Sequence, residues 1–171
     1  MKRKQSGFKI MMRLIKLVKP LAGFMLLAIL LGVTGFLCAI QITTLGSMTL
    51  LTAAGINGGI AIKTGCICII VFAVLRGFLH YGEQACNHYI AFKLLALIRD
   101  KVFKSLRRLA PAKLEGKDKG NLISLITSDI ELLEVFYAHT ISPVCIAFLT
   151  SLIMLAFIGR YSLWLALVAV E

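Results

Sequence analysis

The sequence predicts an all-α membrane protein. Of its 171 residues, 59% are hydrophobic and 16% are charged, whereas soluble domains carry about 25% charged residues. Residues 20–62 contain no charged side chain, and a transmembrane helix needs only about 20 apolar residues. Two membrane spans therefore begin within this uncharged stretch.

The net charge of +11 is concentrated in two blocks that flank the apolar stretches. Basic residues cluster from Lys2 to Lys19 and again from Lys93 to Lys119. This pattern is typical of cytoplasmic segments under the positive-inside rule. We therefore expect a multi-pass protein of the cell (plasma) membrane with a cytoplasmic amino terminus. Nucleic-acid binding is not favoured, because no aromatic side chains accompany the basic residues as a stacking platform.

The amino-terminal region and the cysteines exclude two other classes. The apolar region from Leu21 to Ile40 is too long for the core of a signal peptide, and no small-x-small cleavage site follows it. The cysteines form no C-x-x-C pair, so their spacing indicates neither a zinc site nor a disulfide framework. They are Cys38, Cys66, Cys68, Cys86 and Cys145.

The first predicted elements are a basic interfacial segment and a membrane span. Residues 1–19 contain "FKIMMRLIKLVK", whose apolar and basic residues fall on different faces, as in a helix lying in the membrane interface. Residues 20–171 form the membrane domain, and the first span covers about 21–45. The glycine-rich stretch 52–63 then predicts a loop on the outer side.

The second predicted helix, about 64–109, is longer than a membrane span. It contains no proline and would measure roughly 70 Å, against a hydrocarbon core of about 30 Å. More than half of it is expected to extend into the cytoplasm, where its apolar and basic residues occupy different faces. Pro111 ends this helix and begins a short turn, residues 111–119.

A third helix is predicted over about 121–158, and residues 163–171 begin a fourth span. The fourth stretch has about nine residues where about 20 are needed. We therefore expect the chain to be an amino-terminal fragment of a longer membrane domain.

Four polar residues of the second helix fall within an arc of about 60° near the inner leaflet. They are Arg76, His80, Glu83 and Asn87. Intramembrane polar groups usually face a bundle interior or a wet cavity, so these residues are candidates for a translocation path in which Arg76 attracts a carboxylate. The alternative is a structural network in which Arg76, His80 and Glu83 satisfy one another. No catalytic or metal site is predicted, because His80, Glu83 and His88 do not converge on one ion.

Two motifs carry a family resemblance. "KGNLISLITSDIE", from Lys119 to Glu131, resembles the pattern at the base of the third helix of ABC exporters, with matches at Gly120, Leu122, Ser124 and Asp129. "RGFLHYGEQACNHYIAFKLLALIRDKVFKSLRRLAPAKL", from Arg76 to Leu114, is similar to the CydC-type subunit of thiol-reductant ABC exporters. The matching positions are Tyr81, Glu83, His88, Phe92, Leu95 and Arg99. Where that family has arginine, this chain has His80, Gln84 and Leu125.

The resemblance implies the amino-terminal part of the six-helix exporter transmembrane domain, with helices extending into the cytoplasm. It further implies a permease portion that exports cysteine or glutathione in support of cytochrome bd assembly. The implied partners are a nucleotide-binding domain, which would bind ATP and Mg²⁺, a CydD-like second subunit and the lipid bilayer. These residues contain no G-x-x-x-x-G-K-[ST] loop, so no cofactor or ATPase site is expected within them. A small stand-alone membrane protein with a structural or regulatory role is the alternative.

The resemblance also assigns roles around the short turn. The turn would dock on the nucleotide-binding domain, although a solvated loop is the simpler interpretation. Its residues are Ala112, Lys113, Leu114, Glu115, Gly116 and Lys117. Gly120, Ser124 and Asp129 would pack the base of the third helix. Asp129 lies on an apolar face without the family's arginine four residues earlier, so a partner is predicted among Arg99, Arg107 and Arg108.

Overall fold

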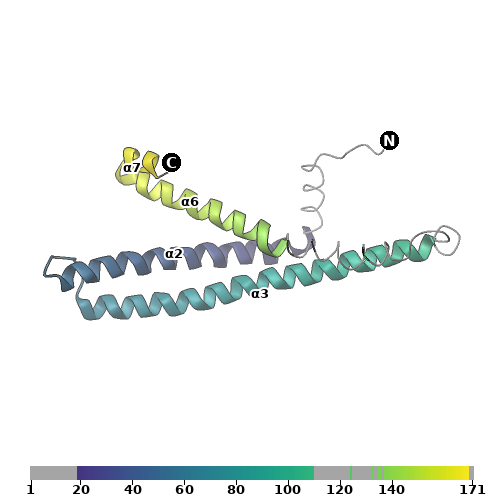
Figure 1. Cartoon of the computed structure of the whole chain (residues 1–171), viewed down its shortest axis with the longest axis horizontal. Helices are drawn as coiled ribbons and strands as arrows, with labels where there is room; N and C mark the ends of the chain where they lie inside the picture. Colours follow the sequence, from purple (N-terminus) through teal and green to yellow (C-terminus); the bar gives the residue numbers. More distant parts are fainter. Residues whose placement is uncertain (1–18, 110–123, 125–131, 133–134, 136, 170–171) are drawn as a thin grey trace. The chain divides into compact units, whose positions relative to one another are not determined.

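A computed structural model describes residues 19–109, 124, 132, 135 and 137–169 (Figure 1). The elements in this part of the chain are all helical, which confirms the predicted all-α class. They are a 3₁₀ turn η1 (Lys19–Leu21), the helices α2 (Ala22–Ala53) and α3 (Ile62–Leu109), a π-helical turn η3 (Tyr137–Ile141), and the helices α6 (Ser142–Tyr161) and α7 (Leu163–Val168).

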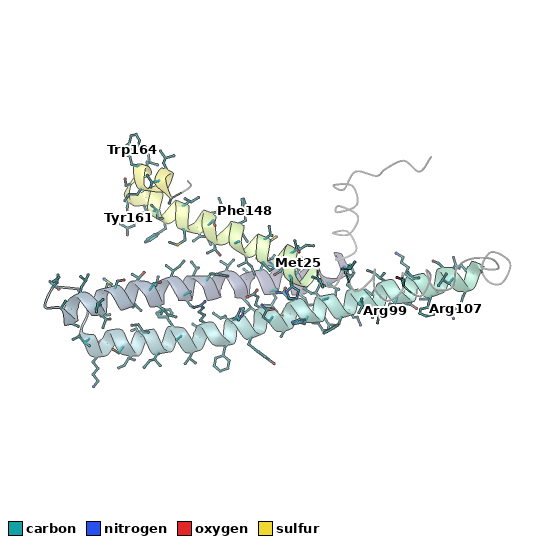
Figure 2. The ribbon with its side chains drawn as sticks, in the orientation of Figure 1. Met25, Arg99, Arg107, Phe148, Tyr161 and Trp164 are labelled. Atoms are coloured by element: carbon teal, nitrogen blue, oxygen red, sulfur yellow. The ribbon has the colours of Figure 1, made fainter. Side chains whose placement is uncertain are left out.

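Three of the described helices are long and apolar enough to cross a membrane. They cover Ala22–Ala53, Ile62–Arg108 and His139–Tyr161. Large apolar side chains stand exposed along them, as lipid-facing residues do; Phe78 is 72% exposed and Phe148 is 64% exposed. Figure 2 shows Phe148 projecting from α6 and Trp164 from α7. The chain is therefore a multi-pass membrane protein.

The loop between the first two helices is shorter than the sequence indicated. Helix α2 continues to Ala53, beyond the predicted span 21–45, and α3 begins at Ile62. The added turns of α2 contain several hydroxyl residues: between Thr43 and Thr52, hydroxyl groups donate to the carbonyl oxygen four residues earlier, as Thr44 does to Ile40 at 2.9 Å. These bonds satisfy the hydroxyls inside the helix.

The third membrane helix contains a wide turn that the sequence analysis did not predict. The π-helical turn Tyr137–Ile141 comes directly before α6, whose second residue is Pro143. Proline has no N–H to donate, and in a regular α-helix its ring would clash with the carbonyl group four residues earlier, that of His139. A π turn moves that carbonyl group aside. At its other end, α6 includes Gly159 and ends at Tyr161, beyond the predicted limit at 158.

The chain divides into two compact units. The first consists of residues Met1–Leu26 and Cys86–Ser142. Its buried core is formed by Leu21, Ile90 and Leu94, with Met25, Ile98 and Ile141 packed against them. The Phe24 and Tyr89 rings add a tilted contact at 4.6 Å between centroids.

The first unit also contains the charged half of α3. Lys104 donates to Asp100 at 2.6 Å, in an exposed pair one helical turn apart. Arg107 and Arg108 lie in the last turn of α3, where positive charge complements the helix dipole. Figure 2 shows Arg99 and Arg107 on this half of the helix. With 48 residues, α3 is about 70 Å long and exceeds the hydrocarbon core of a bilayer.

The second unit consists of Leu27–Ala85 and Pro143–Glu171. Within it, α2 and α3 run antiparallel and approach closely at glycines. A Cβ added to Gly35 would lie 3.7 Å from Leu79 Cβ, and one added to Gly82 would lie 3.2 Å from a methyl group of Leu31. Small residues at such crossings let membrane helices pack by close van der Waals contact.

A compact turn, residues 54–61, joins α2 to α3. Gly55 and Gly59 have φ of +82° and +76°, a backbone conformation that favours glycine. The Asn57 side chain accepts from the Gly59 N–H at 3.1 Å. The Thr52 hydroxyl lies 3.1 Å from the Met48 carbonyl oxygen and 3.0 Å from that of Ile60. This hydroxyl therefore ties the end of α2 to the start of α3.

Replacing this threonine tests the tie. Thr52→Val is expected to lower the free energy of unfolding by about 1 kcal/mol, because the Ile60 carbonyl loses its cross-turn donor. The measurement is the apparent melting temperature of the purified protein in detergent. Thr43→Val is the matched control, since the Thr43 hydroxyl contacts only carbonyl groups of its own helix. Equal losses in the two variants would contradict a tie across the turn.

Candidate functional site

A cavity of about 640 Å³ lies within the second unit. Helix α2 contributes Gly32, Gly35 and Phe36 to its wall, and α6 contributes Pro143, Ile146 and Ala147. The part of the wall formed by α3 runs from Ala73 to Gln84. The small residues on all three helices leave the space that larger side chains would fill. Cavities of this volume are in the range of small-molecule sites, about 300–1,000 Å³.

The ionisable residues of the cavity all come from α3. Arg76, His80 and Glu83 line it together with Gln84. Three of them follow one another at helical spacings of four and three residues, which places their side chains on one face. The predicted polar arc is thus assembled in the structure as far as Glu83.

Glu83 is the most buried ionisable group of the cavity. Its side chain is 8% exposed, and its Oε2 lies 3.2 Å from Nδ1 of His80, whose side chain is 66% exposed. When the Nδ1 nitrogen carries hydrogen, it donates to the carboxylate. A carboxylate in an apolar region needs such a donor, because burial without one is costly. His80 thereby fixes the position of the carboxylate at the cavity wall.

Arg76 does not complete this pair. Within the described part of the chain, its guanidinium forms neither an ion pair nor a hydrogen bond. Of the structural network proposed as an alternative, the link between His80 and Glu83 is present, and the link to Arg76 is absent among the described residues. Arg76 lines the cavity as an exposed positive charge.

The close approach of α2 gives Glu83 its surroundings. A Cβ added to Gly32 would lie 2.9 Å from Cγ1 of Ile146 and 3.3 Å from the carboxyl carbon of Glu83. Real Cβ atoms rarely approach another side chain so closely, so only glycine fits between these two neighbours. Gly32 therefore brings α2, α3 and α6 together beside the carboxylate.

The fourth residue of the predicted arc lies elsewhere. Asn87 belongs to the first unit and does not line the cavity. It is 3% exposed, and its side-chain N–H₂ group has no hydrogen-bond partner in the described structure. Sequence reasoning also missed Gln84, Gly32 and Phe36. For Gly32 a signal existed, because Ala28, Gly32 and Gly35 recur on one face of the first span.

The remaining predicted residues lie mostly outside the described part of the chain. This holds for Gly120, Asp129 and the whole turn from Ala112 to Lys117. Ser124 is described as an exposed helical residue. The residues that the structure describes include no group of three or more His, Cys, Asp or Glu side chains arranged to hold a metal ion.

The membrane helices of this chain match a known protein family. Residues 21–170 match the ABC transporter transmembrane region. The chain belongs to this family. The cavity between α2, α3 and α6 therefore lies in the transmembrane region of an ABC transporter, where charged groups commonly mark the path of a polar solute.

Curated relatives share the same region. A probable ABC transporter ATP-binding/permease protein of Haemophilus influenzae (strain Rd) is 52% identical over 166 residues, which cover 97% of this chain and 30% of that protein. CydC, a glutathione/L-cysteine transport system ATP-binding/permease protein of Escherichia coli (strain K12), is 28% identical over 105 residues, 61% of this chain and 16% of that protein. ATP-dependent lipid A-core flippase 1 of Colwellia psychrerythraea is 30% identical over 122 residues, 70% of this chain and 20% of that protein. The chain spans less than a third of the length of these relatives.

Proposed function

We propose that the chain is the first part of the permease of an ATP-driven exporter that moves a small thiol, such as cysteine or glutathione, out of the cytoplasm in support of cytochrome bd assembly. The cavity lined by Arg76, His80 and Glu83 supports this proposal. It offers a polar solute a charged site between membrane helices, where ionisable residues often mark the path of a substrate.

The proposed partners follow from this role. A nucleotide-binding domain would bind ATP and Mg²⁺ and dock on the turn from Ala112 to Lys117, and a CydD-like subunit would complete a heterodimer. The amino terminus would lie in the cytoplasm of a cell whose plasma membrane holds the transporter, because the two basic blocks then share one side.

The chemistry of the cavity favours a small polar solute over a lipid. CydC is named for glutathione and L-cysteine transport, whereas the flippase is named for lipid A-core. The buried carboxylate of Glu83 attracts an amine, and the Arg76 guanidinium in the same cavity attracts a carboxylate, two groups that amino acids and small peptides carry. The volume of about 640 Å³ suits a solute of amino-acid or small-peptide size.

Transport measurements test this proposal. Inside-out vesicles containing the complete transporter and its partner subunit are expected to accumulate radiolabelled cysteine or glutathione when ATP and Mg²⁺ are present. Vesicles with a non-hydrolysable ATP analogue provide the control. Equal accumulation with and without ATP hydrolysis would contradict ATP-driven export, and selective movement of lipid A-core would assign the substrate to the lipid class.

Cross-linking tests the docking turn. The Leu114→Cys variant is expected to form a cross-link to a cysteine placed on the facing surface of the nucleotide-binding domain, because exposed loops on rigid supports often carry contacts with partners. Gel electrophoresis under non-reducing conditions measures the product. Ile56→Cys, in the exposed turn that joins α2 to α3, is the matched control, because Ile56 does not have a positive φ. Absence of a cross-link for Leu114→Cys in a folded complex would favour a solvated loop.

A further inference from the structure

Two opposite charges, those of Arg76 and Glu83, line the cavity and do not pair with each other in the described structure. Glu83 contacts His80 at 3.2 Å, and Arg76 has no polar partner in the described part of the chain. Seven residues separate Arg76 from Glu83 on α3, which corresponds to about 10 Å along the helix axis. The positive and negative groups therefore stand two helical turns apart on the wall of one cavity.

Glu83 is the buried member of the two, and its apolar surroundings favour a counter-charge beside the carboxylate. Helices α2 and α6 contribute Gly32, Phe36 and Ile146 to the cavity wall, and charges interact more strongly in such surroundings than in water because the local dielectric constant is low. An isolated charge in such a region is stabilised by a counter-charge. Within the described structure, neither Arg76 nor Glu83 receives a formal counter-charge when His80 is neutral.

We propose that the cavity binds a zwitterionic ligand, with the anionic group of the ligand paired to Arg76 and its ammonium group paired to Glu83. This inference rests on the proposed function of the cavity as the site of the transported solute. It assigns amine recognition to Glu83, which makes the carboxylate a determinant of specificity in addition to Arg76.

The local geometry holds Glu83 ready for this role. Nδ1 of His80 occupies one carboxylate oxygen, Oε2, and the carboxyl carbon lies beside Gly32, where a Cβ would be 3.3 Å away. The carboxylate is thereby fixed between α2 and its own helix before a ligand enters. A fixed acceptor loses less conformational entropy on binding than a mobile one.

Three probes separate the two charges of the ligand. S-methyl-L-cysteine is a zwitterion, its methyl ester carries only the ammonium group, and its N-acetyl derivative carries only the carboxylate. The blocked sulfur prevents reaction with the five cysteines of the chain. Binding is measured by isothermal titration calorimetry on the complete transporter in nanodiscs, without ATP. Discs with and without phosphatidylethanolamine distinguish a free solute from a zwitterionic lipid headgroup, because the lipid would compete with the probe.

We expect a crossed pattern, in which each cavity variant loses the preference for one charged group of the ligand and keeps the preference for the other. The unmodified protein should bind the zwitterion at least about tenfold more tightly than either derivative, since each charge-assisted contact contributes that much. Glu83→Gln should remove the preference for a free ammonium group and keep the preference for a free carboxylate. Arg76→Gln should do the reverse. Lys63→Gln removes a positive charge that does not line the cavity and should change neither preference.

Other patterns would overturn the inference. If Glu83→Gln and Arg76→Gln weakened all three probes equally, the two residues would be structural. If S-methyl-L-cysteine bound no more tightly than its methyl ester and its N-acetyl derivative, the cavity would not select zwitterions. Because binding is measured without ATP, failure of thiol transport would leave this result intact. Conversely, loss of the crossed pattern would leave ATP-driven transport of another ligand intact.

Discussion

Gly32→Leu is expected to lower the free energy of unfolding by about 3 kcal/mol, because the new side chain has no space where α2, α3 and α6 meet. A Cβ alone would already lie 2.9 Å from Cγ1 of Ile146. The measurement is the apparent melting temperature of the purified protein in detergent, with the helical circular dichroism signal as the probe of unfolding. A loss of this size would prevent much of the protein from reaching the membrane in a folded form.

Two further variants make this prediction specific to the contact. Gly46→Leu lies on the same helix, and an added Cβ there meets no described neighbour within 4 Å, so its melting temperature should change little. The double variant Gly32→Ala with Ile146→Ala should be more stable than the sum of the single changes predicts, because the smaller neighbour makes room for the methyl group. Additive effects would contradict a direct contact between Gly32 and Ile146.

Glu83→Gln is expected to reduce transport at least about tenfold while leaving the melting temperature unchanged or raised. The amide oxygen can still accept from Nδ1 of His80, so the local hydrogen bond is retained. A buried charge is removed, which often stabilises a protein. If Glu83 served only structure, the variant would instead lose stability and transport together. The measurements are initial transport rates in vesicles and melting curves of the same preparation.

An exposed carboxylate on the same helix provides the matched control for this variant. Asp100 is paired with Lys104 and its side chain is 55% exposed. Asp100→Asn should change neither quantity measurably, because exposed ion pairs contribute only about 0–1 kcal/mol. A tenfold loss of transport in Asp100→Asn would show that charge at any point of α3 matters, and the role assigned to Glu83 would then be unsupported.

The membrane helices and part of the cavity could be predicted from sequence because their signals are local. The uncharged stretch before Lys63 marks two spans, and helical spacing alone places Arg76, His80 and Glu83 on one face. Contacts between helices carry no such signal. Nothing in the residues around Gly32 says that Ile146, more than 100 positions later, fills the space beside it.

Two other features depended on how helices resolve a local conflict. Pro143 is visible in the sequence, yet a proline can kink a helix, end it or follow a π turn, and the structure has the turn Tyr137–Ile141. The glycine-rich stretch 52–63 indicated a loop. Thr52 nevertheless stays in α2, where its hydroxyl lies within hydrogen-bond distance of the Met48 and Ile60 carbonyl oxygens.

The most direct test of the cavity as the transport site is ATP-dependent accumulation of labelled cysteine or glutathione in inside-out vesicles that contain the complete transporter. Wild-type protein is compared with Arg76→Gln, Glu83→Gln and the charge-removal control Lys63→Gln, all at equal amounts of folded protein. If the cavity is the transport site, both cavity variants should transport at least about tenfold more slowly, and Lys63→Gln should transport at an unchanged rate. Wild-type rates in Arg76→Gln and Glu83→Gln would contradict this role of the cavity.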